Sequence, residues 1–347
     1  PPLFQAEDGI RDKRGGLVGS EMCIRDRPIR LGRGFAPGEL TLPFEMEKPL
    51  LAVGAHMKNT ITLAWNNRAV MSPHIGEMDS ARSLAVFEQT IEDLQRLYNV
   101  KVEQLVCDAH PGYTTSRWAR NQGLPLHNVF HHHAHASSAY YECAAAGPLL
   151  VFTWDGVGLG VDGSLWGGEA LLGTPGEWQR VASMRPFHLP GGDKAGREPW
   201  RSAAALCWET GCETSVLPED SSLLFEAWQR RVNSPRTTAV GRLFDAAAAL
   251  TGVCSTASFE GQGPMALEAL CGEPGRNIEL TLEKNDKILI TNWGPLVAAL
   301  SDSTLSVSAR ASLFHASLAQ ALHQQARSIR EEHGVNDVSF SGGVFQN

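Results

Sequence analysis

The sequence lacks several features that would place it in a class at once. Its 347 residues include seven cysteines but no C-x-x-C pair, so neither a zinc finger nor a disulfide frame is indicated. No apolar run approaches the roughly 18 residues of a membrane span, and the first residues hold no apolar core of the length that a secretory signal needs. The net charge of −8 leaves no excess of positive charge for nucleic acid. We therefore predict a cytoplasmic protein with no membrane and no nucleic-acid partner.

The remaining composition is that of a globular chain. Hydrophobic residues make up 43% and charged residues 20%, and the length suffices for two domains with real cores. Residues 1–27 have no helical or strand period and resemble a translated sequencing adapter, so we exclude them from the fold. Residues 28–47 are rich in Pro, Gly and Arg and predict an extended linker.

Strand–turn–strand patterns open the rest of the chain twice, at residues 48 and 147. The first is expected as a three-stranded meander with a turn at Asn66 and Asn67, and the second as two strands around a glycine turn after Asp155. Segments with helical spacing follow each: 81–99, the histidine stretch at 130–138, parts of 195–275, and 308–334. This alternation predicts an α/β protein of the duplicated actin-like ATPase (ASKHA) fold. Residues 48–146 would form the first lobe and 147–347 the second, with a nucleotide and a metal in the cleft between them.

The stretch FHHHAHASS, residues 130–138, carries four histidines within five positions of a chain that has 12 in all. His131 and His135 are four residues apart, so both project from one face of a helix. Two imidazoles at this spacing can chelate one metal ion. The zinc-peptidase pattern is not met, because His132 stands where that pattern has its catalytic Glu. The alternative is a polar helix start whose histidines only form hydrogen bonds.

Acidic and glycine-rich stretches supply further candidates. Asp155 could complete a two-histidine, one-carboxylate site for iron or zinc, although a plain Asp-Gly hairpin turn is the alternative. Gly342 and Gly343 follow a strand, as in a phosphate loop. Asp245, on a helix of small residues, is placed to take ribose hydroxyls, or else is an exposed surface carboxylate. Lys58, in the turn GAHMKNT, either meets a phosphate or is merely solvated.

Taken together, these stretches resemble one family, the carbamoyltransferase HypF, which matures [NiFe]-hydrogenases. The resemblance runs from residue 28 to 347 and rests on motifs in a fixed order: RGFAP, KNT, DAHPGY, HHHAH, DGVG, LWGGE, PGGDKAGREPWR, GRLFDA, EGQGPMALEAL and SGGVFQN. The covered part looks like the C-terminal carbamoyl-transfer domain, which is similar to TsaD. The lead-in at residues 28–47 looks like the exit from a YrdC-like domain, which this chain does not contain.

The resemblance implies specific site residues. The metal ligands would be His131, His135 and Asp155, and a fourth, an Asp in a later DGG turn, is expected beyond residue 347. The chain is therefore expected to be truncated at its C-terminus and inactive by itself. Nucleotide contacts are implied for a larger set of residues: Asp155, Gly156, Asp245, Glu260, Gly261, Gly342, Gly343 and Asn347. No general base stands out, so His110, His133 and Lys58 are only candidates for a catalytic role.

The implied chemistry is carbamoyl transfer. The family's domain would take carbamoyl-adenylate, made from carbamoyl phosphate and ATP with Mg²⁺ in the full enzyme, and pass the carbamoyl group to the C-terminal cysteine of the partner HypE. One divalent metal, iron or zinc, would act as a Lewis acid. The resulting thiocarboxamide becomes the cyanide ligand of the hydrogenase iron.

Three other interpretations stay open. An O-carbamoyltransferase of the antibiotic or nodulation-factor type has similar motifs but carries its YrdC-like part after this domain. An actin-like sugar kinase should show a catalytic Asp and no histidine pair. A non-catalytic scaffold that docks HypE would need neither a metal nor transfer activity.

Overall fold

The computed structural model describes residues 29–31, 34–36, 38–213, 221–272 and 276–346. These residues form two compact units that divide after Val129. The sequence predicted the division after residue 146; the structure instead assigns the histidine-bearing helix α5, His131–Glu142, to the second unit. The predicted adapter-like segment, 1–27, lies outside the described residues. Within them, no helix is both long and apolar enough to cross a membrane.

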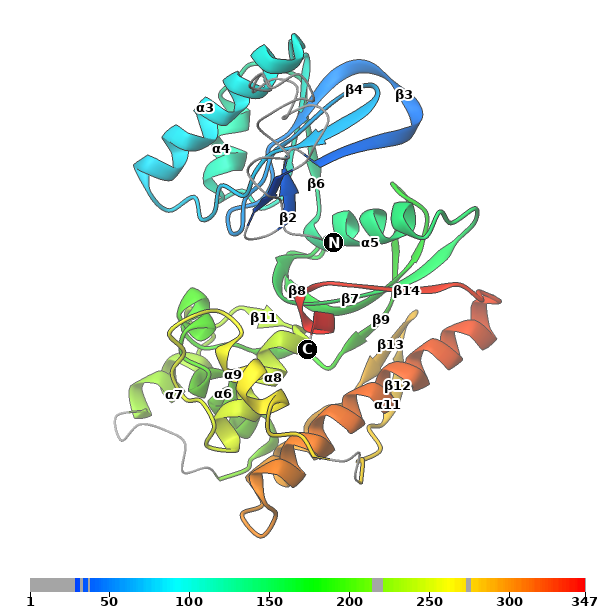
Figure 1. Cartoon of the computed structure of the whole chain (residues 1–347). Coiled ribbons are helices and arrows are strands. Elements are labelled where there is room, and N and C mark those ends of the chain that lie inside the picture. The colour runs from blue at the N-terminus through cyan, green and yellow to red at the C-terminus, as the bar shows by residue number, and fades with distance from the viewer. Residues whose placement is uncertain (1–28, 32–33, 37, 214–220, 273–275, 347) are drawn as a thin grey trace, which may run out of the picture. The chain divides into compact units, whose positions relative to one another are not determined.

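The first unit is built on a four-stranded sheet with the order β4-β3-β5-β6. Its strands are β3 (Gly38–Ala52), β4 (Thr62–Met71), β5 (Gln104–Asp108) and β6 (Leu126–Val129). The pair β3–β4 is antiparallel, whereas β5 and β6 add in parallel. Helices α3 (Ala81–Tyr98) and α4 (Thr114–Arg120) make the crossovers (Figure 1). Ser80 caps α3, because its side chain accepts a hydrogen bond from the backbone N–H of Ser83.

The predicted linker is corrected from Gly38 onward, because residues 38–47 belong to the long strand β3. Leu40, Leu42, Phe44 and Met46 alternate with polar residues or Pro, a strand period that the prolines masked. Pro43 is tolerated there because this half of β3 pairs only with β4, whereas β5 joins only at Leu50–Ala52. The residues before it include two short strands, β1 (Ile29–Leu31) and β2 (Gly34–Ala36), which pair with each other.

The predicted Asn-Asn turn is wrong. Asn66 and Asn67 lie inside β4, where the register to β3 shifts on both sides of the Met46–Asn66 pair. Asn66 has a φ of +48°, a conformation that Asn tolerates and that an irregular strand pairing can use as readily as a reversal. The expected three-stranded meander is therefore a two-stranded hairpin.

The second unit is built on an eight-stranded sheet. It opens with the antiparallel pair β7 (Leu149–Leu159) and β8 (Leu165–Gly173), and the last strand, β14 (Val338–Ser341), adds in parallel to β7. On the other side of β8 follow β9 (Gln179–Met184), β13 (Ile288–Thr291) and β12 (Leu282–Asn285). Two short strands, β10 (Phe187–His188) and β11 (Arg236–Thr237), complete it.

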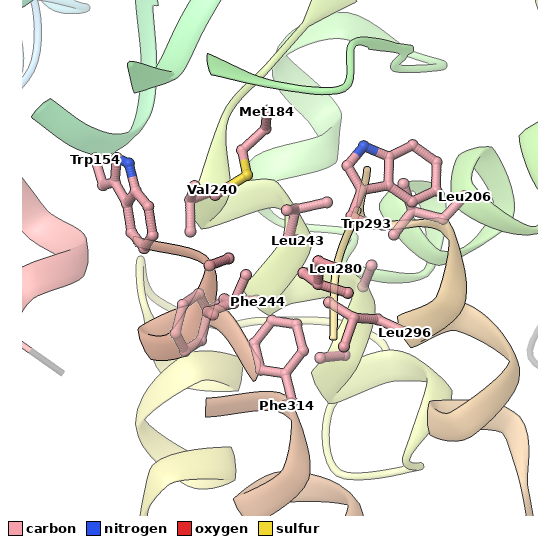
Figure 2. Close-up of a cluster of buried hydrophobic side chains, with 14 of the residues drawn as sticks. Trp154, Met184, Leu206, Val240, Leu243, Phe244, Leu280, Trp293, Leu296 and Phe314 are labelled. Atoms are coloured by element: carbon pink, nitrogen blue, oxygen red, sulfur yellow. The ribbon is translucent and has the colours of Figure 1, made fainter. Parts of the chain in front are cut away.

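Helices cover this sheet on two faces. The main core gathers Leu150, Phe152 and Trp154 of β7 with side chains from one group of helices. That group is α6 (Trp200–Thr210), α8 (Val240–Leu250), α9 (Gln262–Glu268), α10 (Gly294–Ser301) and α11 (Val307–His333), with α7 (Ser222–Gln229) nearby in the chain. Figure 2 shows Trp154 among the side chains of this core. A smaller core joins Leu149 and Val151 to Ala136 and Ala139 of α5. The alternation along β7 thus places α8 and α5 against opposite faces of the same strand.

Candidate metal and nucleotide site

Strand β7 delivers a carboxylate to the histidine helix. Leu149 and Val151 face α5. Because alternate residues of a strand point to the same face, Asp155 also faces α5. Asp155 therefore lies within β7, at a register shift between Trp154 and Gly158. The sequence predicted Asp155 at the end of a strand, directly before a glycine turn, and this is wrong. The chain reverses direction only after Leu159, where the backbone N–H of Gly160 donates to the carbonyl of Ser164.

Three predicted ligands converge in the second unit. Asp155 Oδ2 lies 3.1 Å from His131 Nε2 and 3.4 Å from His135 Nε2, and the two imidazole nitrogens are 3.2 Å apart. A tetrahedral metal with bonds of about 2.0–2.1 Å holds its ligand atoms about 3.3–3.4 Å apart. The side chains are 23–29% exposed, so an ion can reach them. In the described part of the chain, this is the one group of three or more such ligands.

The two histidines also influence the charge of Asp155. Burial by itself would raise the pKa of this carboxyl group, but hydrogen bonds and positive charge from His131 and His135 outweigh it and hold the pKa well below its usual range. The carboxylate therefore stays ionised at neutral pH. Two imidazoles and one carboxylate fit zinc or iron(II), which accept such mixed nitrogen and oxygen ligands.

Ser341, which the sequence analysis did not single out, supports the same site. Strand β14 pairs Ser341 with Thr153 of β7, so it shares the face of β7 that α5 covers. Its Oγ lies 3.0 Å from Nδ1 of His135. A hydrogen bond at the second ring nitrogen fixes the tautomer and the orientation of a ligating histidine. No residue-type signal marked Ser341, since a lone Ser before two glycines is common in turns.

Gly158 lets the histidine helix approach β7. A Cβ atom at this position would lie 2.6 Å from Cε1 of His132 and 2.8 Å from Cδ2 of His131. Both distances are shorter than real Cβ contacts, so a larger residue would displace the helix. His132 itself is fully buried, and burial lowers its pKa well below the usual value. It packs beneath the site and does not join the three converging atoms.

Helix α8 brings the predicted ribose-binding acid to the opposite side of the same strand. A Cβ atom at Gly241 would lie 2.8 Å from the Cα atom of Gly156 and 3.0 Å from the carbonyl oxygen of Asp155, so the first turn of α8 packs directly on this backbone. Asp245, one turn further, is only 4% exposed. The alternative of an exposed surface carboxylate is therefore wrong. Burial raises the pKa of Asp245 to about 6, although Arg242 nearby lowers it.

Other predicted nucleotide residues lie around this backbone. A Cβ atom at Gly343 would be 3.2 Å from Oδ1 of Asp155, so the turn of Gly342 and Gly343 after β14 adjoins the candidate metal ligand Asp155. Glu260 and Gly261 directly precede α9, which packs on α8, and the charge of Glu260 is among the influences that raise the pKa of Asp245. Asn347 lies outside the described residues.

The geometry gives little support to a catalytic role for His133, His110 or Lys58. His133 sits on α5 beside Phe130 and Trp166, and burial lowers its pKa, so it is neutral at pH 7. His110 belongs to the first unit; its ring stacks on Tyr113, and its Nδ1 accepts the backbone N–H of Gly112. A neutral His110 in this arrangement carries its proton on Nε2, while its other nitrogen, Nδ1, already accepts the hydrogen bond from Gly112.

The third candidate, Lys58, lies in the β3–β4 loop with a φ of +51°.

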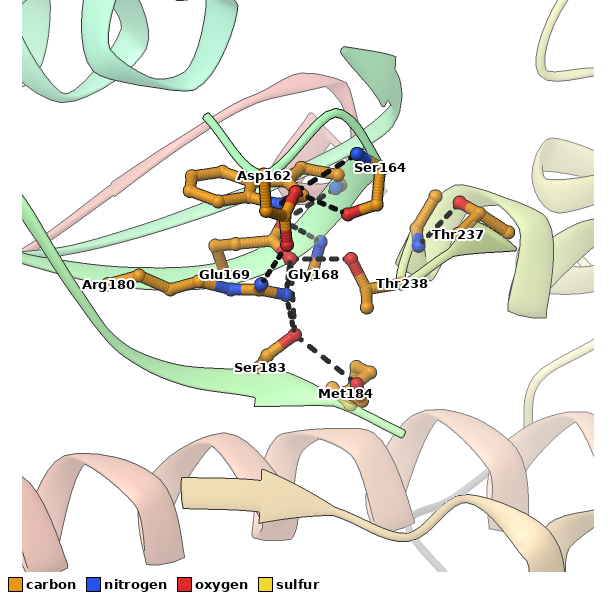
Figure 3. A network of polar contacts seen from close by, with 12 residues as sticks. Asp162, Ser164, Gly168, Glu169, Arg180, Ser183, Met184, Thr237 and Thr238 are labelled. Carbon is orange, nitrogen blue, oxygen red and sulfur yellow. Dashed lines mark hydrogen bonds and ion pairs between the residues drawn. The ribbon is translucent and has the colours of Figure 1, made fainter. Parts of the chain in front are cut away.

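A buried polar cluster fixes the segment that leads into α8 (Figure 3). The carboxylate of Glu169 is fully buried and accepts hydrogen bonds from the backbone N–H groups of Gly167 and Gly168, at 2.6 and 2.7 Å. The side chains of Arg180, Ser183 and Thr238 also donate to it. Since Thr238 lies two residues before α8, Glu169 ties the start of that helix to β8 and β9.

Fold and site define an α/β protein in which a carboxylate and two histidines meet beside a helix that carries a buried acid. Two family models match the chain: "HypF Kae1-like domain" over residues 45–142 and "Carbamoyltransferase, Kae1-like Domain, second subdomain" over residues 151–347. The chain belongs to the HypF family of carbamoyltransferases.

Relatives agree with this assignment. The carbamoyltransferase HypF of Synechocystis is 37% identical to this chain over 92% of it, and the HypF homolog of Cupriavidus necator is 33% identical over 86%. A crystal structure of full-length HypF in the phosphate- and nucleotide-bound form has a TM-score of 0.84 at 30% identity, covering 90% of this chain. The chain spans 44% of the Synechocystis protein and 42% of the crystallised one.

Proposed function

We propose that this chain is the carbamoyl-transfer part of a HypF protein, acting on carbamoyl-adenylate and the C-terminal cysteine of HypE in the cytoplasm. The observation that carries the proposal is the convergence of His131, His135 and Asp155 in a chain of this family. One divalent metal, iron or zinc, would be held by these three side chains and would supply Lewis acidity at an oxygen of the bound adenylate.

The chain's own residues have distinct tasks in this proposal. Asp155 remains ionised and gives the site its negative charge, while Ser341 orients His135. Asp245 accepts hydrogen bonds from the ribose hydroxyls, and the turn at Gly342 and Gly343 offers backbone N–H groups to the phosphate. The cysteine thiolate attacks the carbamoyl carbon, the bond from this carbon to the phosphate oxygen breaks, and AMP leaves with its electron pair.

We further propose that the two units are the duplicated lobes of an actin-like ATPase fold. In support, each unit contains an antiparallel hairpin, β3–β4 or β7–β8, whose first strand pairs in parallel with a later one, β5 or β14. The buried acid and the three converging ligands speak against a simple docking scaffold, because a scaffold needs neither.

The metal part of the proposal is tested by elemental analysis of a purified chimera, in which residues 28–347 of this chain replace the matching segment of Synechocystis HypF and the expected fourth ligand is supplied by the sequence that follows. The parent should retain close to one iron or zinc, whereas His131→Ala and His135→Ala should each lose most of it. His133→Ala is the matched control, since it removes a neighbouring imidazole outside the converging group. Equal metal content in all four proteins would rule out this site.

The transfer reaction is tested in a chimera of Synechocystis HypF, in which residues 28–347 of this chain replace the matching segment. Supplied with carbamoyl phosphate, ATP and HypE, it should produce a thiocarboxamide on the HypE cysteine, detected by mass spectrometry. The same chimera with His131→Ala should produce none. Modification of a hydroxyl compound in place of the HypE thiol would instead favour the O-carbamoyltransferase interpretation.

A further inference from the structure

Arg242 is a cation beside the candidate site with unused hydrogen-bonding capacity. It lies in the first turn of α8, and its side chain is 15% exposed. Its Nη1 atom lies 3.0 Å from Oδ2 of Asp245. Within the part of the chain that the structure describes, neither its buried Nε nor Oδ2 of Asp245 has a hydrogen-bond partner. The two groups therefore attract each other by charge without the aligned hydrogen bonds that a structural Arg–carboxylate pair normally forms.

The guanidinium lies next to the backbone that carries the metal ligand. A methyl group placed on Gly156 would be 3.4 Å from Nη2 of Arg242, and one placed on Gly196 would be 3.5 Å from Nη1. Gly156 directly follows Asp155 in β7. Arg242 thus occupies a position between the buried acid of α8 and the strand that carries Asp155.

This order along the protein matches the order of groups in a carbamoyl-adenylate. In that molecule, the phosphate separates the ribose from the carbamoyl group. If Asp245 takes the ribose and the carbamoyl end lies near Asp155, the phosphate comes to the group between them. We propose that Arg242 binds this phosphate and neutralises the charge that grows on it as AMP leaves; the assignment rests on the proposed function. A planar guanidinium suits the task, because it donates two parallel hydrogen bonds to phosphate oxygens.

A purely structural role for Arg242 makes a different prediction. If it only holds Asp245 in place, its loss should weaken every ligand that Asp245 contacts through the ribose. If it binds the phosphate, its loss should weaken AMP and spare adenosine. Comparing these two ligands separates the roles, since they differ only in the phosphate group.

The experiment is isothermal titration calorimetry of the 347-residue chain with AMP and with adenosine. Arg242→Gln should lower the affinity for AMP by about tenfold or more, the effect of losing a hydrogen bond to a charged group, and change that for adenosine by less than about twofold. Arg327→Gln is the control, because Arg327 is 72% exposed on α11 and forms a surface ion pair with Glu331; it should leave both affinities unchanged.

Each other outcome counts against the proposal. Equal losses for both ligands would make Arg242 a positioning residue for Asp245, and unchanged AMP affinity would remove it from the site. If Arg242→Gln does not fold, Arg242→Lys serves instead. Lysine keeps the positive charge but cannot donate two parallel hydrogen bonds, so the affinity for AMP should still fall more than the affinity for adenosine. Failure of the parent chain to bind either ligand would overturn the proposed function itself, and this assignment with it.

Discussion

At the scale of single residues, the site combines groups whose charges are set by different means. Asp155 is kept ionised by two imidazoles, whereas Asp245, on the other side of β7, is made more basic by burial. The pKa of Asp155 on β7 is thus lowered, and the pKa of Asp245 on the neighbouring helix α8 is raised. Strongly shifted pKa values of this kind are common in functional sites. Asp155 is suited to hold a cation at any neutral pH, and Asp245 is suited to respond to pH.

The raised pKa of Asp245 leads to a pH-dependent affinity for adenosine. With a pKa of about 6, the carboxyl is mostly protonated at pH 5 and mostly ionised at pH 7. Only the ionised form accepts hydrogen bonds from both ribose hydroxyls, so we expect the affinity to rise about tenfold over this interval. Asp245→Asn keeps the size but cannot titrate, and its adenosine affinity should be weaker and nearly flat with pH. Calorimetry at pH 5, 6 and 7 measures both proteins; parallel curves would show that Asp245 does not contact the nucleoside.

At the scale of elements, the site depends on how closely α5 can lie on β7. Gly158→Ala adds a methyl group where His132 and His131 already fill the space. Overpacking of this kind costs about 1–3 kcal/mol in stability, and the shift of α5 should separate His131 from Asp155. We therefore expect zinc affinity to fall at least about tenfold, the lower range for losing a group that orients a ligand.

The matched control for this substitution is Gly147→Ala, in the connection between α5 and β7. A Cβ atom there meets nothing within 4 Å, so the added methyl group should change neither stability nor zinc affinity. Competition against a chromogenic chelator gives the affinity, and urea unfolding gives the stability. If Gly158→Ala binds zinc like the parent, α5 does not need this close approach.

The polar cluster around Glu169 is expected to be essential to the second unit. Glu169→Gln removes the charge opposite Arg180, whose side chain is 14% exposed, and puts an NH₂ group where donors converge. Breaking one partner of a buried ion pair costs about 3–5 kcal/mol. Asp162→Asn is the control, since Asp162 is the second, 42% exposed partner of Arg180 and should contribute at most about 1 kcal/mol. Equal effects in chemical unfolding would contradict the difference in burial.

Much of the element order could be predicted from the sequence, since long periodic segments carry strong signals. The helices predicted at 81–99 and 308–334 are confirmed as α3 (Ala81–Tyr98) and α11 (Val307–His333). The errors came where one residue type is compatible with two different local structures. Asn66 was assigned to a turn because Asn favours positive φ, yet it occupies such a φ within a strand. Pro43 suggested a linker, yet it fits the half of β3 that pairs on one side only.

The site was only partly predictable for a similar reason. The spacing of His131 and His135 follows from helix geometry, and the structure places Asp155 beside them as expected. Ser341, Glu169 and Arg242 were missed, because Ser341 bonds to His135, Glu169 to Thr238, and Arg242 lies beside Gly156, all contacts between segments far apart in the chain. Local sequence patterns carry no information on such contacts when only one sequence is read.

At the scale of the whole molecule, the chain divides its tasks between two units. All three converging ligands, as well as Asp245 and Arg242, lie in residues 130–347. The first unit, by contrast, brings together His56, Asp79, His110 and Tyr113 from three separate segments: His56 bonds to Asp79 at 2.6 Å, and both histidine rings stack on Tyr113. A metal at the proposed site should therefore act on the stability of the second unit alone.

This separation gives an expectation for metal-linked stability. Zinc at 100 times its dissociation constant should stabilise the folded second unit by about 2.7 kcal/mol, which for a unit of this size raises the unfolding temperature by roughly 5–10 °C. Hydrogen exchange with mass spectrometry assigns the effect, and protection should increase in peptides from α5, β7 and β14 but not in those from α3 and β5. His131→Ala combined with His135→Ala should abolish the change in both readouts. Added protection throughout residues 38–129 would mean that the ion binds elsewhere, or that the two units do not unfold independently.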